Sequence, residues 1–134
     1  MKKRQSGVLM HISSLPGKYG IGSFGQSAYD FVDFLVRTKQ RYWQILPLGT
    51  TSYGDSPYRS FSAFAGNTYF IDFDILIEEG LLNEADVKGA DFGDDPRKVD
   101  YAKIFDASRP IMEKAVARFL KADDLSDYES FVEQ

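Results

Sequence analysis

The chain has 134 residues, 43% of them hydrophobic and 27% charged, which fits one folded domain with a hydrophobic core and excludes a disordered chain. The net charge of -4 does not favour nucleic-acid binding, and the basic cluster at residues 2–4 is interpreted as a solvated terminus. Cysteine is absent, which excludes a disulfide scaffold and a thiolate metal site, and no apolar run is long enough to cross a membrane.

The first predicted element is a buried strand from Gly7 to Ile12. Its sequence, GVLMHI, is a short apolar run between a glycine and a segment rich in serine, proline and glycine, as is typical of a strand that enters a loop. The run includes His11, the single histidine of the chain. Without a second histidine or a cysteine, His11 is interpreted as a packed, hydrogen-bonded residue, and no metal site is expected.

The loop that follows contains Gly20, Gly22 and Gly25 in the GxGxxG spacing of dinucleotide-binding sites. In such sites the motif directly follows the strand, and a carboxylate near the end of the second strand holds the ribose. Here residues 13–19 separate the strand from the glycines, and the second predicted strand ends in Ile-Leu-Pro-Leu. Nucleotide binding is therefore rejected, and no cofactor is expected.

A helix is predicted next, capped by Ser27 and ending near Thr38. Asp30 lies three residues after Ser27, as in a capping box. Apolar residues recur on one helical face, namely Ala28, Phe31, Val32 and Leu35. The run Tyr42–Leu48 predicts a second strand covered on both sides, as parallel strands are. Together these elements predict a βαβ unit with a right-handed crossover.

The segment from residue 49 to Asp72, the aromatic loop, is unusually rich in aromatic side chains. They are Tyr53, Tyr58, Phe61, Phe64, Tyr69 and Phe70. Because aromatic rings are unfavourable in water, such a loop either folds onto itself as a cap or lines a binding site. In parallel α/β folds ligands bind where the strands end, so the position of the loop favours a binding site.

The second half of the chain is predicted to be helical. Residues 73–82 form a short helix that ends or bends at Gly80, and Asn83 caps another helix. Residues 99–121 form a long helix with an apolar face from Ile111 to Leu120, which Pro110 kinks or divides. Residues 126–129, SDYE, have the pattern of a capping box that opens a last helix.

Three pairs of neighbouring carboxylates occur in polar segments. They are Asp72 with Asp74, Asp94 with Asp95, and Asp123 with Asp124. Calcium sites need several oxygen ligands around a turn set by glycine, and that spacing is absent. All three pairs are interpreted as solvated surface.

Several motifs, taken in order, resemble the N-terminal signature of a known enzyme family. They are HISSLPGKYGIGSFG, RYWQILPLG and YGDSPYRSFSAFAGN followed by YFID. Residues 7–72 are closely similar to the amylomaltases, the 4-α-glucanotransferases of glycoside hydrolase family 77, which are related to the α-amylases. The chain has Ile12-Ser13 where the family often has Pro-Thr, and Thr68 where it often has Pro. Residues 73–134 resemble the family only in general character.

The resemblance implies an α/β fold, the N-terminal portion of a (β/α)8 TIM barrel with helical insertions. A complete barrel needs around 250 residues, and this sequence predicts two barrel strands, so the barrel is expected to be incomplete in this chain. Residues 1–72 then form the first βαβ unit and the aromatic substrate loop. Residues 73–134 form a mainly helical insertion subdomain that is cut off at the C-terminus.

The implied activity is transfer of α-1,4-glucan segments between maltodextrin or starch chains by a retaining double displacement. That mechanism needs two carboxyl groups about 5–5.5 Å apart. The family places its catalytic carboxylates on later strands, so they are expected beyond Gln134, and no catalytic residue is assigned in this chain. Substrate binding is implied for Tyr58, Ser56, Asp55 and Tyr53. Tyr58 stacks on the sugar next to the cleaved bond, and Tyr53 lies on an outer glucan-contacting surface.

The expected partners are maltooligosaccharides or starch-type glucans, without nucleic acid or membrane, and the expected location is cytoplasmic. The exposed edges of a partial barrel also predict self-association. A second function stays open, that of a stand-alone oligosaccharide-binding or structural module without catalysis. A reading frame that continues past Gln134 with carboxylates at strand ends favours the enzyme.

Overall fold

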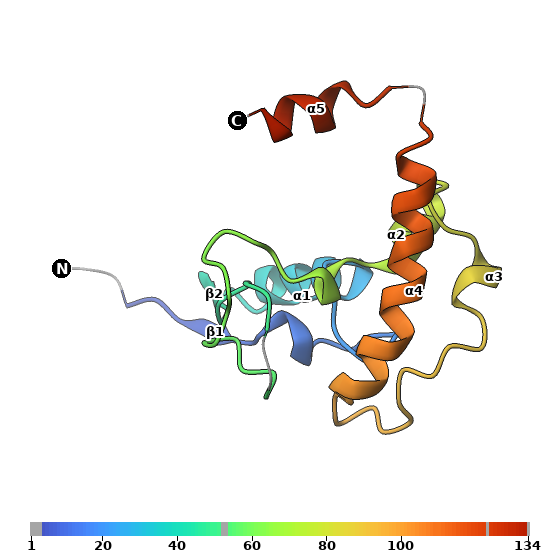
Figure 1. The fold of residues 1–134 in the computed structure, drawn as a ribbon. Helices are drawn as coiled ribbons and strands as arrows, with labels where there is room; N and C mark the ends of the chain where they lie inside the picture. Colours follow the sequence, from blue (N-terminus) through green and yellow to red (C-terminus); the bar gives the residue numbers. More distant parts are fainter. Residues whose placement is uncertain (1–3, 52–53, 123, 134) are drawn as a thin grey trace.

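The computed structural model describes residues 4–51, 54–122 and 124–133 and has an α/β fold. In chain order the elements are β1 (Gly7–Leu9), the 3-10 turn η1 (Ile12–Ser14), α1 (Gln26–Arg37), β2 (Tyr42–Gln44), the 3-10 turn η2 (Thr68–Phe70), α2 (Phe73–Glu78), α3 (Glu84–Val87), α4 (Tyr101–Phe119) and α5 (Ser126–Val132). Helix α4 stands upright beside the rest of the fold, and α5 lies beyond its end (Figure 1). Within the described residues, no helix is both long and apolar enough to cross a membrane.

The strands β1 and β2 form a two-stranded parallel sheet joined through α1. Gly7 is paired with Tyr42, and Val8 is paired with Trp43. Helix α1 packs on this sheet, with the rings of Phe31 and Trp43 in a T-shaped contact 4.9 Å between centroids. Phe31 and Trp43 are both only half-buried. The predicted parallel strand-helix-strand unit is confirmed.

Both strands are shorter than predicted. The first ends at Leu9, and Ile12 turns into the core as part of η1, where its side chain is fully buried. The second ends at Gln44, and Ile45 remains 36% exposed. A sheet of two strands with one helix on it leaves one face open, so β2 is not covered on both sides as expected.

The hydrophobic core lies next to the sheet and combines the segment from Ile12 to Ile21 with residues from α1, α2 and α4, and Trp43 of β2 packs against it. Its buried residues are Ile12, Leu15, Ile21, Ala28, Phe70, Phe73, Leu82, Phe92, Ile104, Ile111 and Ala115. Residues from both halves of the sequence are therefore needed to remove this apolar surface from water.

Helix α1 begins at Gln26, with Gly25 as its N-cap, two residues before the predicted cap Ser27, and without a side-chain cap. The capping box predicted for Ser27 and Asp30 is therefore wrong. A Cβ atom on Gly25 would collide with the carboxylate of Asp72, which also accepts a hydrogen bond from the Ser23 hydroxyl. Glycine is required there because α1 starts against the cap of α2.

The pair Asp72 and Asp74 is structural, which corrects its interpretation as solvated surface. Asp72 is the N-cap of α2 and accepts hydrogen bonds from the amides of Asp74 (2.9 Å) and Ile75 (3.3 Å). Asp74 accepts hydrogen bonds from Lys18 and the Tyr19 hydroxyl, which join α2 to the glycine-rich loop. Both carboxylates are half-buried.

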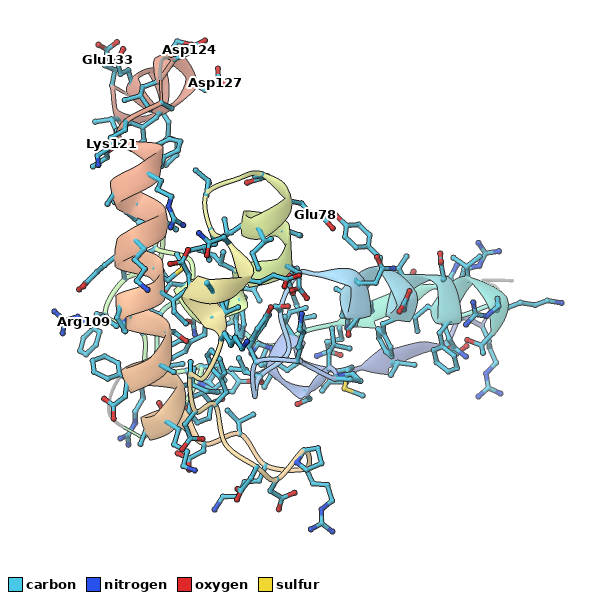
Figure 2. All side chains as sticks on the ribbon, turned by 90° about the vertical axis from the view of Figure 1, so that its right-hand side faces the viewer. Glu78, Arg109, Lys121, Asp124, Asp127 and Glu133 are labelled. Atoms are coloured by element: carbon cyan, nitrogen blue, oxygen red, sulfur yellow. The ribbon has the colours of Figure 1, made fainter. Side chains whose placement is uncertain are left out.

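Helix α4 runs through Pro110 without a break, so the proline does not divide it. Its N-cap is Asp100, which accepts a hydrogen bond from the amide of Lys103 at 3.2 Å. The predicted apolar face is only partly buried, since Val116 and Leu120 are about half exposed. On the outer side, Arg109 points away from the body of the fold, as Figure 2 shows.

The cap of α3 was predicted correctly, and the cap of α5 was not. The predicted cap Asn83 is confirmed, and the structure adds a capping box with Asp86, whose two reciprocal hydrogen bonds measure 3.0 and 3.2 Å. Helix α5 begins at Ser126, but its cap position is Leu125 and it has no side-chain cap. Asp124 instead accepts a hydrogen bond from the Ser126 amide, so the predicted box is wrong. Asp124 lies with Asp127 and Glu133 around α5 (Figure 2). Asp123 is outside the described residues.

The Asp86 carboxylate also joins α3 to α4. It accepts a hydrogen bond from Arg118 at 2.6 Å and pairs with Lys114 at 3.3 Å, and its side chain is 11% exposed. The hydrogen bond from Arg118 is the main cause that lowers the pKa of Asp86 from 3.8 to about 2. Because the folded state favours the charged form, the resulting stability is present above pH 3.8 and is lost as the pH falls through about 2.

We expect Asp86→Asn to lower the urea midpoint of this chain at pH 5 and to have progressively less effect as the pH falls toward 2. The midpoint can be followed by fluorescence of Trp43, the single tryptophan of the sequence. Asp94→Asn, in an exposed loop, is the matched control. An effect of Asp86→Asn that stays constant from pH 5 to pH 2 would contradict the assigned role of the charge.

Candidate functional site

A small cavity of about 120 Å³ lies where β1 and β2 end. Parallel strands bring their carboxyl ends to the same edge of a sheet, so residues that follow β1 and β2 meet there. The aromatic loop and the first turn of α4 complete the walls. The lining residues are His11, Ser13, Ser14, Leu46, Pro47, Thr51, Asp55, Pro57, Asn67, Phe70 and Tyr101.

The aromatic loop is closed at its base. Gly49 and Gly66 form an antiparallel bridge, and the amide of Asn67 donates to the carbonyl of Leu48 at 2.9 Å. The buried side chain of Asn67 then accepts a hydrogen bond from the Tyr69 amide at 3.0 Å. Compact surface loops whose two ends lie close together are frequently functional sites.

Serine side chains hold the interior of the loop. The Ser60 hydroxyl donates to the carbonyl of Ser62 at 2.6 Å and lies 3.2 Å from the hydroxyl of Thr50. A Cβ atom on Gly49 would lie only 2.7 Å from the Ser60 hydroxyl, so glycine permits this close approach. The loop therefore has its own hydrogen-bonded framework.

Tyr58 lies on a tight turn at the outside of the loop. The amide of Arg59 donates to the carbonyl of Ser56 at 3.0 Å, with Pro57 and Tyr58 between them. Proline fixes φ at the position it prefers in such turns, so the backbone direction at Tyr58 is well defined. The Tyr58 side chain is 71% exposed, and Phe61 and Phe64 are more exposed still. These three rings do not fold back into a cap.

Asp55 has a left-handed backbone conformation, with φ of 53°, directly after Gly54 with φ of 92°. Aspartate tolerates this region better than most residues, although such positions cost about 1–3 kcal/mol and are often found at functional sites. Asp55 is half-buried and lines the cavity. Burial first, and then the charge of Asp55, raises the pKa of Tyr69.

Tyr101, the first residue of α4, is a site residue that sequence reasoning missed. Its ring lies 6.3 Å from that of Tyr69 between centroids. It borders the small cavity and a second one of about 730 Å³ that also includes Asp55 and Phe105. Burial is the main cause that raises the pKa of Tyr101. No local pattern indicates this placement, because it depends on how α4 packs.

The residues predicted to bind substrate lie in different environments. Asp55 and Ser56 are half-buried, with Asp55 in both cavities, whereas Tyr58 is exposed on the turn next to them. Tyr53 lies outside the described residues. His11 is buried and hydrogen-bonded, as predicted. Among residues 4–51, 54–122 and 124–133, no group of three potential metal ligands is found.

Comparisons with known proteins agree with one another. A family model described as 4-alpha-glucanotransferase matches residues 10–134. The 4-alpha-glucanotransferase of Streptococcus pneumoniae serotype 4 is 75% identical over 133 residues, which is 99% of this chain and 26% of that protein. The Clostridium butyricum enzyme of the same name is 58% identical over 124 residues, which is 92% of this chain and 25% of that protein.

A solved structure is also similar to this one. It is an amylomaltase from Streptococcus agalactiae in complex with acarbose, with a TM-score of 0.91 and 58% sequence identity. The alignment covers 98% of this chain and 27% of the other chain. This chain thus spans about a quarter of the length of the curated relatives that it matches.

Proposed function

We propose that this chain, which belongs to the 4-alpha-glucanotransferase family, forms the N-terminal portion of an enzyme that transfers α-1,4-glucan segments. The donors and acceptors are maltodextrin or starch chains, and the mechanism is a retaining double displacement. The observation that carries the proposal is the match of nearly the whole fold to an amylomaltase that was solved with acarbose bound. The alternative is an oligosaccharide-binding or structural module without catalysis.

In this proposal β1 and β2 are the first strands of an incomplete (β/α)8 barrel. Their parallel pairing through α1 supports it, as does the cavity at their carboxyl ends, where barrel enzymes bind substrate. Residues 1–72 form the first βαβ unit with the substrate loop, and residues 73–134 form a mainly helical insertion. The catalytic carboxylates belong to the part of the enzyme outside residues 1–134.

Tyr58 stacks on the donor sugar next to the cleaved bond. Its exposed ring on a well-defined turn supports this role, because a pyranose has apolar C–H faces that gain from burial against an aromatic ring. Asp55 and Ser56, half-buried beside it, contact sugar hydroxyls. Tyr53 contributes to an outer glucan-contacting surface.

The proposed partners are maltooligosaccharides and starch-type glucans in the cytoplasm. Self-association of the isolated chain is proposed as well. The half-exposed Val116 and Leu120 on α4 and the largely exposed Phe131 on α5 support this, because apolar surface of this kind favours association in water.

The complete protein is expected to convert maltotriose into glucose and longer maltodextrins, and residues 1–134 alone are expected to convert none. In this proposal the two carboxyl groups that the retaining mechanism needs lie outside residues 1–134. Products are measured by chromatography with increasing amounts of each purified protein. Products that scale with the isolated chain, or their absence with the complete protein, would contradict the proposal. Glucan binding without turnover by the complete protein would favour the binding module.

A further inference from the structure

The ladder between β1 and β2 ends in an unusual way. The amide of Met10 still donates to the carbonyl of Gln44 at 3.0 Å. In a regular parallel ladder the next bond would run from the Leu46 amide to the Met10 carbonyl. That carbonyl instead accepts a hydrogen bond from the indole of Trp43 at 2.7 Å, and the Leu46 amide donates to Nδ1 of His11 at 3.3 Å. The side chain of His11 thus replaces the Met10 carbonyl as the acceptor for the Leu46 amide.

This hydrogen bond defines the protonation state of His11. An Nδ1 atom that accepts a hydrogen bond carries no proton, so the ring is the neutral form with its proton on Nε2. The ring is held in place, since His11 is 8% exposed and packs edge-on against Phe70 at 5.3 Å between centroids.

The position of Leu46 matters because Leu46 and Pro47 lead directly into the aromatic loop. His11 forms one wall of the 120 Å³ cavity, and Asp55 and Pro57, the residues around the Tyr58 turn, form part of another. A shift of the chain at Leu46 would therefore change where the loop starts and how the turn lies over the cavity.

We propose that His11 is a positioning residue for glucan transfer, which in its neutral form holds the Leu46 amide and so sets the loop that presents Tyr58. The kinetic part of this inference rests on the proposed function. The hydrogen bond itself can be tested without it.

The proposal includes a dependence on pH. A protonated His11 carries a hydrogen on Nδ1 and no longer accepts the Leu46 amide. Asp55 from the aromatic loop and Tyr101 from α4 are the titratable groups that line the same cavity, whereas Leu46, Pro47, Asn67 and Phe70 contribute no charge. Burial lowers the pKa of His11 below 6.5. The positioning is therefore present at neutral pH and is lost as the pH falls through that lowered pKa.

Two amide variants separate the roles of the ring nitrogens in the complete protein. In His11→Asn the side-chain oxygen can lie near the place of Nδ1 and accept the Leu46 amide. In His11→Gln the longer side chain carries its amide toward the place of Nε2. The first readout is hydrogen exchange of the Leu46 amide, corrected for its intrinsic rate. We expect exchange about 10-fold faster in His11→Gln, as for the loss of one hydrogen bond, and a change within about 3-fold in His11→Asn.

The second readout is kinetics on maltotriose. We expect His11→Gln to lower kcat about 10-fold with KM within about 2-fold, and His11→Asn to restore kcat, as a positioning role requires. As the pH is lowered, the Leu46 exchange rate relative to its intrinsic rate should rise in the wild type and stay low in His11→Asn. Slow Leu46 exchange in His11→Gln, or equal loss of kcat in both variants, would overturn the proposal. If the wild-type protein does not act on maltotriose, the proposed function fails, and hydrogen exchange alone still decides the role of His11.

Discussion

Tyr58→Ala in the complete enzyme is expected to lower kcat/KM on maltotriose by about 30- to 900-fold, equivalent to about 2–4 kcal/mol of transition-state stabilisation. Pro57 and the hydrogen bond between Arg59 and Ser56 fix the backbone of the turn, so the position from which the Tyr58 ring extends is set before the sugar arrives. Stacking on a flattened, oxocarbenium-like sugar is stronger in the transition state than in the ground state. The variant should therefore lower kcat as well as raise KM.

Two other variants test this assignment. Tyr58→Phe keeps the ring and should cost less than Tyr58→Ala if stacking dominates. Tyr53→Ala should mainly weaken the affinity for long glucans. Steady-state kinetics of all three variants on maltotriose and amylose give the comparison. Wild-type kcat in Tyr58→Ala together with a lost kcat in Tyr53→Ala would show that the two roles are assigned the wrong way round.

Ile104→Ala is expected to lower the free energy of unfolding of this chain by about 2–5 kcal/mol. Ile104 lies on the inner side of α4 and is fully buried in the core, so its truncation removes apolar contacts and leaves a cavity. Urea unfolding followed by Trp43 fluorescence measures the effect. Val116→Ala, on the same helix at 50% exposure, is the control and should cost less than about 1 kcal/mol. Equal losses in both variants would contradict the location of the core.

The predicted strands were right in position and wrong in length for a physical reason. The apolar runs that start at Gly7 and Tyr42 continue past the strands, but apolar character does not distinguish a strand residue from one that turns into a core. Ile12 does the latter, in a 3-10 turn, and belongs to the same core cluster as residues from α2 and α4. Such contacts come from distant parts of the sequence and are not visible in a local pattern.

Helix caps were also predicted correctly only where they depend on residues that are neighbours in sequence. The cap Asn83, which forms a local and complete box with Asp86, was predicted correctly. At α1 the carboxylate of Asp72 fills the space at Gly25, so the start of the helix is decided by the N-cap residue of α2 and not by Ser27. A pattern of four residues predicts a cap well only when no other element packs against it.

The sequence indicates a candidate site only as far as its residues are neighbours in sequence. The prediction of sugar contacts for the motif around Tyr58 rests on its resemblance to the amylomaltases, and its position after a parallel strand follows from the βαβ pattern. The contribution of Tyr101 and the bond between His11 and Leu46 depend on tertiary packing. Neither has a signature that spacing or composition could supply.

The wide sequence separation of the core residues has a consequence for synthesis on the ribosome, where the N-terminal part of a chain emerges first. The strands and α1 can form once Gln44 has emerged, but the core around Ile12 is completed only when Ile104 and Ala115 have left the exit tunnel. Until then the nascent chain has uncovered apolar residues, which are the binding sites that chaperones recognise. Translation speed between α1 and α4 therefore sets how long this segment depends on protection.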